Sequence, residues 1–304
     1  YKLHMDPALW RWTASFLSQC RSSKWVQNSD FKFRLAQYSI DMLADLRLTT
    51  NINFDVSDQG IAYASRNPSD LKKLRSHFNF LEDRGLKLEL LDRDGLHEKL
   101  PLLQPNSETY AGAVFSPNCK TGDSAKFSIE LGKWCVENSK CRLVWGASVE
   151  KFLQKNNKIS RVLTSKGEFK ADAYVLAAGA HSGILAKQLD IKLPIYPIKG
   201  FSITAPLINT ESKSMSGFDD TDKLVALSIF GDRLRISSSA VFDGFNTSHQ
   251  SQDFQRILNL AKEILPDAAN YSAAKYWAGL RPMTPSSLPI LGPSPIQNLY
   301  LNVG

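Results

Sequence analysis

A run of small residues at the end of a predicted strand constrains the fold of this chain most strongly. Residues Tyr174 to Ala178 predict a buried strand, and a helix is predicted to begin near Ser182. Small side chains at the carboxyl end of a parallel strand allow a ligand to approach the backbone closely. The turn made by Ala177, Ala178 and Gly179 is therefore a candidate ligand site, and tight packing between the helix and the strand is the alternative explanation.

Strand-rich segments lie on both sides of this turn. Residues 142–175 predict three short antiparallel strands, with turns at Asn156-Asn157 and Lys166-Gly167, that lead into the buried strand. Residues 193–276 predict further strands, including a hairpin at Gly231-Asp232, and a helix from about Ser251 to Leu265. These blocks alternate along the chain, so the sequence predicts interleaved domains of an α/β fold with α+β character.

Two amphipathic helices are predicted in the first third of the chain. The first carries an apolar stripe and ends near Thr49; the stripe consists of Phe31, Leu35, Tyr38, Met42 and Leu46. We expect this stripe to belong to the hydrophobic core. A second helix opens at Asn67-Pro68-Ser69, with Ser69 as the expected N-cap residue.

Composition is that of a globular protein with a sizeable core, because 43% of the residues are hydrophobic and 22% are charged. No continuous apolar run reaches the roughly 20 residues of a transmembrane helix. The net charge of +7 permits an acidic partner, but the basic residues are dispersed, which favours solvated faces over a nucleic-acid site. Four cysteines without metal-ligand spacing predict free thiols in the cytoplasm and no metal site; they are Cys20, Cys119, Cys135 and Cys141.

Two longer blocks carry a family resemblance. The first is Gly279-Leu280-Arg281-Pro282 with Thr284-Pro285, a turn at residues 288–292 and an apolar strand at residues 299–301. The second block is residues 171–204, which contain the small-residue turn and the sequence Pro-Ile-Lys-Gly-Phe-Ser. Together they resemble the D-amino-acid oxidase (DAO) superfamily of FAD enzymes, and within it bacterial D-amino-acid dehydrogenases. Ser286-Ser287 and residues 237–239 depart from the family, which has glycine-containing pairs there.

The resemblance implies an FAD/NAD(P)-binding-like domain interleaved with an antiparallel-sheet substrate domain. Residues 1–59 would be a helical part on the FAD side, 60–120 and 194–278 the substrate domain, 121–193 the FAD-binding meander and parallel strand, and 279–304 an incomplete return to the FAD-binding domain. No G-x-G-x-x-G sequence occurs in the chain, although the family begins with a unit that carries it. We therefore expect a fragment, truncated at both ends and inactive by itself.

The resemblance also implies the chemistry. The family oxidises D-amino acids to 2-oxo acids and ammonia with FAD, and its dehydrogenases pass electrons to a respiratory-chain acceptor. Such an acceptor implies peripheral contact with the inner face of the cytoplasmic membrane. The alternatives are a related amine or 2-hydroxy-acid oxidase of the glycine or sarcosine oxidase type, and a non-catalytic scaffold that kept the fold.

Seven residues are the candidate site. The resemblance makes Arg281 the partner of the substrate carboxylate, because a guanidinium forms two parallel charge-assisted hydrogen bonds with a carboxylate. An arginine that ties the turns at Pro282 and Pro285 is the alternative. The resemblance assigns the other six residues to FAD binding; they are Val149, Ala177, Ala178, Gly179, Gly279 and Gly304. For Val149, an ordinary core position in a strand is an equal alternative.

Overall fold

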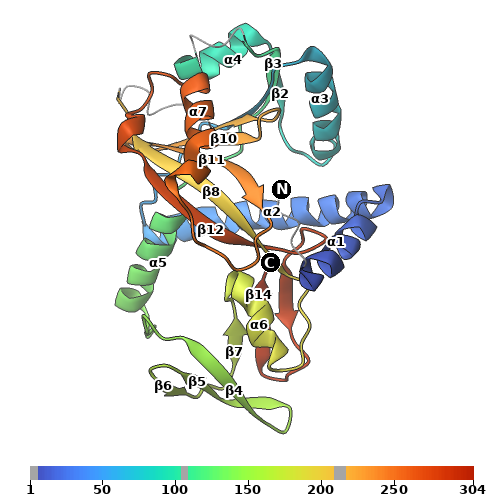
Figure 1. Cartoon of the computed structure of the whole chain (residues 1–304), viewed down its shortest axis with the longest axis vertical. Coiled ribbons are helices and arrows are strands. Elements are labelled where there is room, and N and C mark those ends of the chain that lie inside the picture. The colour runs from blue at the N-terminus through green and yellow to red at the C-terminus, as the bar shows by residue number, and fades with distance from the viewer. Residues whose placement is uncertain (1–5, 104–108, 209–216) are drawn as a thin grey trace.

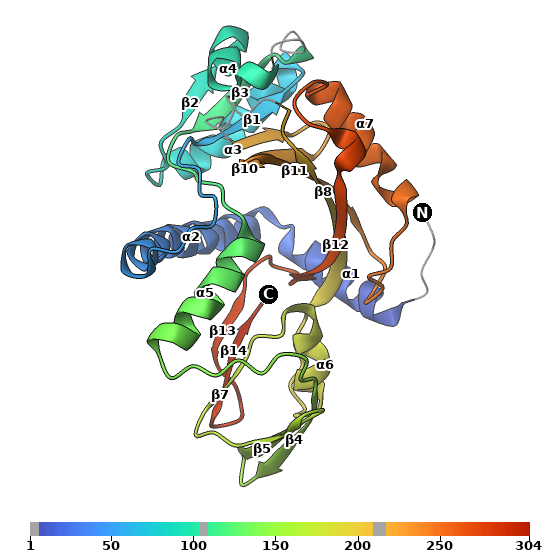
Figure 2. The same cartoon turned by 90° about the vertical axis from the view of Figure 1, so that its left-hand side faces the viewer.

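The computed structural model describes residues 6–103, 109–208 and 217–304. A large sheet with its covering helices forms one end of the molecule, and two small sheets form the other (Figure 1). The long helix α2 (Ser22–Thr50) crosses between them, as the view turned by 90° also shows (Figure 2).

The large sheet has eight strands in the order β12-β8-β11-β10-β9-β1-β3-β2. Their bounds are β1 (Ile61–Ser65), β2 (Glu89–Leu91), β3 (Gly112–Ser116), β8 (Tyr196–Pro206), β9 (Gly217–Asp220), β10 (Val225–Phe230), β11 (Arg233–Val241) and β12 (Lys275–Met283). Strands from residues 60–120 and from residues 194–283 thus lie in one sheet. We expected an antiparallel sheet, but β1 and β9 pair in parallel.

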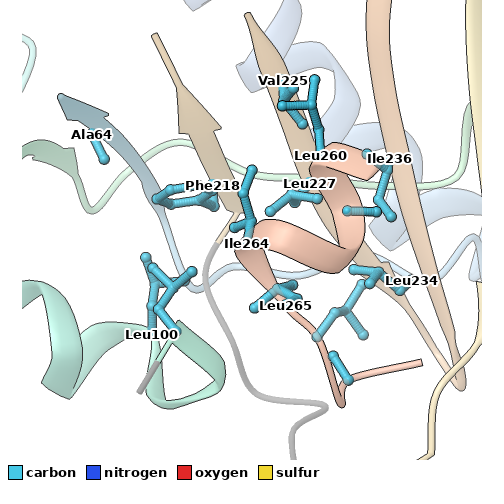
Figure 3. Close-up of a cluster of buried hydrophobic side chains, with 14 of the residues drawn as sticks. Ala64, Leu100, Phe218, Val225, Leu227, Leu234, Ile236, Leu260, Ile264 and Leu265 are labelled. Carbon is cyan, nitrogen blue, oxygen red and sulfur yellow. The ribbon is translucent and has the colours of Figure 1, made fainter. Parts of the chain in front are cut away.

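One face of this sheet carries the main hydrophobic core. The helix α7 (Gln255–Ile264) lies across it, and its buried residues Ile257, Leu260, Ala261 and Ile264 recur at helical spacing. Figure 3 shows Leu260 and Ile264 directed at sheet residues, among them Leu227 and Ile236. The short helix α4 (Arg93–Lys99) adds Leu96 to the same cluster, and α3 (Pro68–Glu82) packs near β1 and β3. Strand β10 directs Val225, Leu227 and Ile229 into this cluster by strand alternation, whereas β3 is buried along its whole length.

The other end of the molecule contains two three-stranded sheets. The first has the order β13-β14-β7, with bounds β13 (Ile290–Pro293), β14 (Leu299–Val303) and β7 (Tyr174–Leu176). The second is the meander of β4 (Val149–Lys155), β5 (Lys158–Thr164) and β6 (Gly167–Phe169). Asn156 and Asn157 join β4 to β5 with φ of 52° and 56°, the positive values that a two-residue hairpin of type I′ requires. The predicted meander is confirmed.

The strand β7 differs from its prediction. It ends at Leu176, which is buried, whereas Val175 is 65% exposed and Ala177 and Ala178 are exposed. The expectation of a fully buried strand is wrong because β7 lies at the edge of its sheet and buries one face. That face contacts a second core cluster that includes Ala186 of α6 (Ser182–Lys187).

Helix α2 also differs from its prediction. It ends at Thr50, as expected, but Phe31 is 44%, Tyr38 62% and Met42 43% exposed, so the apolar stripe is not part of the described core. The helix is packed mainly near its ends: the Trp25 ring lies 5.1 Å from that of Phe80 of α3, and Thr50 is buried. Its periodicity is helical, but periodicity does not show what covers the apolar face.

Two further helices frame the space between the sheets. Helix α1 (Pro7–Gln19) packs against β8, and α5 (Ser124–Asn138) follows the large sheet's first segment. Asp123 caps α5 by accepting from two backbone amides, those of Ala125 and Lys126. Asn67, and not Ser69 as predicted, caps α3 by accepting from the Ser69 backbone amide.

Candidate functional site

Arg281 lies within strand β12, where it pairs with Ile198 of β8. Strand alternation places Arg281 on the face that also carries Trp277 and Gly279. The intervening residues point to the α7 core, where Tyr276 stacks on Phe254 with ring centroids 4.7 Å apart. Arg281 is exposed, and its guanidinium forms no hydrogen bond or ion pair with any residue that the structure describes. It is thus available for an anionic ligand on the open face of the sheet.

Residue 279 has to be glycine because of the Trp277 side chain on the same strand. A Cβ atom at residue 279 would overlap the indole ring of Trp277, which lies over the glycine. The indole is 55% exposed, so it covers Gly279 without being part of the core. The packing explains this glycine without a cofactor, and the assignment of Gly279 to FAD binding stays a prediction.

Arg235 also contacts the Trp277 indole. Its guanidinium carbon lies 5.5 Å from the ring centroid, within the range of a cation–π contact. Its Nη2 also donates to the hydroxyl of Ser202 at 3.1 Å, and Ser202 is only 2% exposed. The indole therefore lies against Gly279 and also contacts an anchored arginine.

Helix α1 covers the end of this face next to Arg281. Trp12 is buried against Tyr196 and Ile198 of β8, and its Nε1 donates to the carbonyl oxygen of Met283 at 2.8 Å. The Tyr196 hydroxyl donates to Asp6 at 2.9 Å, and burial together with this carboxylate raises the pKa of Tyr196 to about 12. Tyr196 is thus a neutral packing residue at pH 7.

Lys199 belongs to the opposite face. It is 5% exposed, and its Nζ donates to Asp243 at 2.9 Å and to the carbonyl oxygen of Ser248 at 3.0 Å. The Lys199 side chain is therefore buried and paired, and it does not extend to solvent. It ties the segment after β11 to the sheet.

The turn after β7 approaches the Arg281 strand. The 3-10 turn η2 (Gly179–His181) packs against β12, so the structure brings these two predicted parts of the site together. Gly179 has φ of +54°, and within residues 6–103, 109–208 and 217–304 no heavy atom lies within 4 Å of the position of a Cβ there. With Ala177 and Ala178 exposed, this is a small-residue surface on which an extended group such as FAD fits without a side-chain clash.

The last two candidates lie in different places. Gly304 has φ of +111°, and a Cβ there would lie 3.2 Å from Cγ2 of Thr284, the residue after β12. The chain therefore returns to the end of the Arg281 strand. Val149 begins β4 and pairs with Thr164 in the meander, which lies beyond β7 from the large sheet (Figure 1). The structure does not bring Val149 next to β12.

An ion-pair network joins the large sheet to α5 and to the segment that follows α2. The Nη2 of Arg233 in β11 donates to Asp55 at 2.8 Å and to Asp123 at 3.1 Å, and Lys126 donates to Asp55 at 2.6 Å. Desolvation raises the pKa of Asp123, but hydrogen bonds from Lys126 and Arg233 outweigh it and lower the pKa below its ordinary value. The network fixes α5 relative to the sheet.

Sequence reasoning did not find Trp277, Arg235 or Trp12. The alternation of apolar and small residues in β12 was the available signal for Trp277. The sequence does not show, however, that the tryptophan ring occupies the space of a side chain at residue 279. A cavity of about 670 Å³ between α1 and residues 183–196 was also not predicted, and no predicted site residue lines it.

Some classes of site are not found in the part of the chain that the structure describes. Residues 6–103, 109–208 and 217–304 contain no group of three or more histidine, cysteine, aspartate or glutamate residues that could hold a metal ion. None of the helices in these ranges has the length and apolar character needed to cross a membrane. All four cysteines are free thiols.

Comparison with known proteins agrees with the resemblance. The family model described as FAD dependent oxidoreductase (DAO) matches residues 8–304. The chain is 36% identical over 303 residues to D-amino acid dehydrogenase 2 of Mesorhizobium japonicum, covering 100% of this chain and 73% of that protein. It is 34% identical over 300 residues to D-amino acid dehydrogenase of Granulibacter bethesdensis, covering 99% of this chain and 72% of that protein.

Solved structures show the same fold. Glycine oxidase from Geobacillus kaustophilus superposes with a TM-score of 0.78 at 22% identity, covering 89% of this chain and 73% of that one. L-proline dehydrogenase from P. horikoshii gives a TM-score of 0.76 at 18% identity, covering 89% of this chain and 72% of that one. The chain therefore belongs to the DAO family of FAD-dependent oxidoreductases.

Proposed function

We propose that this enzyme oxidises D-amino acids to 2-oxo acids and ammonia and passes the electrons to a respiratory-chain acceptor. The observation that carries the proposal is the exposed Arg281 guanidinium, without a partner among the described residues, on the face of the large sheet away from its core. The identity of 32% to 36% with proteins named D-amino acid dehydrogenase supports this substrate class.

In this proposal Arg281 binds the substrate carboxylate. Two parallel hydrogen bonds from the guanidinium fork would fix both the position and the rotation of the substrate, which decides which of its hydrogens faces the cofactor. FAD, when bound, supplies the acceptor for the hydride that leaves the substrate Cα. The Trp277 indole and α1 lie on either side of Arg281 and would limit the access of water to the carboxylate pair.

The cofactor would lie on the small-residue surface of Ala177, Ala178 and Gly179. We propose that Gly304 and Gly279 flank it near β12 and that Val149 contributes from the meander on the adenine side. In the same scheme, residues 60–120 and 194–278 form the substrate domain, and 1–59, 121–193 and 279–304 belong to the cofactor side. The open position at Gly179 supports this scheme.

The substitution Arg281→Lys tests the proposal. It keeps the positive charge but loses the fork, so kcat/KM for a D-amino acid should fall by roughly 10- to 100-fold, equivalent to about 1 to 3 kcal/mol. FAD content should not change. Arg161→Lys is the matched control, because Arg161 is an exposed residue of the meander paired with Glu168, and its kinetics should equal those of the wild type.

Other outcomes would replace this function. Unchanged kinetics in Arg281→Lys with intact FAD content would show that Arg281 does not bind the substrate carboxylate and has a structural role. Oxidation of glycine, sarcosine or a 2-hydroxy acid with oxygen as the acceptor would indicate an oxidase. A protein that binds no flavin would indicate a scaffold.

We further propose a peripheral contact with an anionic membrane, through which the acceptor would be reached. The helix α1 exposes Trp10 (57%) and Leu17 (62%), which lie two turns apart on one side of the helix. The exposed Arg11 adjoins Trp10 in the sequence, and apolar residues beside a basic residue favour binding at an anionic lipid surface. Cosedimentation with anionic vesicles should decrease in the variant Trp10→Ala/Leu17→Ala, and equal binding of both proteins would contradict this contact.

A further inference from the structure

A pair of glycines lies between Arg281 and Trp277 on the open face of the large sheet. Gly200 of β8 pairs with Gly279 of β12. On one side of this pair, Arg281 pairs with Ile198, and on the other side Trp277 pairs with Ser202. Residues two positions apart on one face of a strand are about 7 Å apart, so the glycine pair adjoins the proposed carboxylate partner directly.

The two glycines are not equivalent. At Gly279 the indole of Trp277 fills the space that a side chain would occupy, whereas at Gly200 no heavy atom of the described residues lies within 4 Å of the position of a Cβ. The φ of Gly200 is not positive, so its backbone would accept any L residue. Neither packing against the described residues nor the backbone conformation thus explains why residue 200 is a glycine.

The open space over Gly200, called here the Gly200 hollow, has an apolar wall that is held in place. The wall is the Trp277 indole, and Arg235 fixes it by the contact with the ring and by the hydrogen bond to Ser202. Ile198 next to Arg281 is 6% exposed, because Trp12 of α1 packs on it, so an aliphatic residue borders the hollow on that side. A nearby arginine disfavours a cationic occupant.

We propose that the Gly200 hollow receives the side chain of the substrate and selects D-amino acids with uncharged, apolar side chains. The proposal rests on the proposed function only for the placement of the carboxylate at Arg281. With the carboxylate held there, a side chain that extends along the sheet enters the space above Gly200 and contacts the face or edge of the indole. Gly200 and Trp277 are then specificity-determining residues, and Arg235 is a positioning residue that acts through Trp277.

The substitution Gly200→Ala tests the hollow. A methyl group at residue 200 meets no heavy atom of the described chain, so the variant should fold with an equal or slightly higher melting temperature and an unchanged FAD content. In the FAD-loaded protein, kcat/KM for D-leucine should fall by about tenfold or more, whereas that for D-alanine should change by less than about threefold. Gly132→Ala, in the middle of α5 with ordinary contact distances, is the matched control and should leave both values unchanged.

A binding measurement provides a readout that does not depend on turnover. Calorimetric titration with acetate and with 4-methylpentanoate should show that Gly200→Ala weakens only the longer acid, by about tenfold. The proposed role of the Gly200 hollow would be contradicted if the substitution weakened the binding of both acids equally or of neither acid. It would also be contradicted if neither acid bound to the wild type. If the acids show the predicted discrimination but no D-amino acid is oxidised, the hollow stands and the proposed function fails.

Discussion

The indole nitrogen of Trp12 donates a hydrogen bond to the carbonyl oxygen of Met283 at 2.8 Å, across 271 residues of sequence. The contact ties α1 to the end of β12, two residues beyond Arg281. Trp12 is 8% exposed and stacks on Phe16 with ring centroids 5.3 Å apart. The position of the candidate carboxylate partner therefore depends on a helix that is distant in sequence.

The substitution Trp12→Phe should lower the free energy of unfolding by about 1 to 3 kcal/mol, because it leaves the Met283 carbonyl oxygen without its donor and removes part of a buried ring. Urea denaturation measures this loss. Trp10→Phe is the control, since Trp10 is largely exposed, and it should change the stability by less than about 0.5 kcal/mol. Equal effects of the two substitutions would show that α1 does not stabilise the end of β12.

The ion pair of Asp123 with Arg233 should give a pH-dependent contribution to stability. The substitution Asp123→Asn keeps a good N-cap residue for α5 but loses the charge, so we expect a loss of about 1 kcal/mol at pH 7. The folded-state pKa of Asp123 is lowered, so this contribution is present above the unfolded pKa of roughly 4 and disappears as the pH falls through the folded value. Urea denaturation of both proteins from pH 7 to pH 3 should show the difference shrinking. A constant difference would contradict the pairing.

Asp220 should be the most sensitive charged residue of the large sheet. Its side chain is fully buried and accepts from Arg66 at 2.8 Å, from Tyr110 at 2.9 Å and from the backbone amides of Asp222 and Lys223. Asp220→Ala leaves these donors without an acceptor and should destabilise the protein by about 3 kcal/mol or more. Asp70→Ala, at a half-buried residue of α3 that pairs with Lys73, should lose less than about 1 kcal/mol. Thermal unfolding of both variants decides this, and similar melting temperatures would be inconsistent with the network.

Ser287 has φ of +57°, a conformation that glycine adopts at lower cost than serine. Ser287→Gly should therefore stabilise the protein by about 0.5 kcal/mol after the larger entropy of the unfolded chain is included. Ser286→Gly is the contrasting variant. It has no positive φ to relieve and loses the hydrogen bond in which Ser286 Oγ accepts from the Leu288 amide, so it should destabilise. If both changes lower the melting temperature, the strain assigned to Ser287 is absent.

Local signals in the sequence predicted much of the fold. Asn156-Asn157 and Gly231-Asp232 were placed correctly as hairpin turns, because residues that tolerate positive φ at those positions select the turn. The end of α2 at Thr50 followed from its periodicity. What covers a face was not predictable in the same way: the stripe that includes Tyr38 on α2 and the residue Val175 of β7 are exposed. Periodicity reports a pattern of apolar residues, whereas burial depends on elements distant in sequence.

The candidate site was predictable only in part. The motif around Arg281 identified the residue but did not predict its secondary structure, which is the strand β12. The reason is that β12 continues through Pro282, at the edge of its sheet, where a missing backbone donor is tolerated. The roles of Trp277, Arg235 and Trp12 depend on strand register, which the sequence alone does not supply.

The most direct test of the central claim is the absorbance of the flavin in the FAD-loaded protein, followed anaerobically as single amino acids are added. The account predicts that D-alanine and D-leucine bleach the flavin band and that their L enantiomers do not, with the bleaching by both D-amino acids slowed roughly 10- to 100-fold in Arg281→Lys. Bleaching by L-amino acids, by glycine alone or by 2-hydroxy acids, or an undiminished rate in Arg281→Lys, would contradict it.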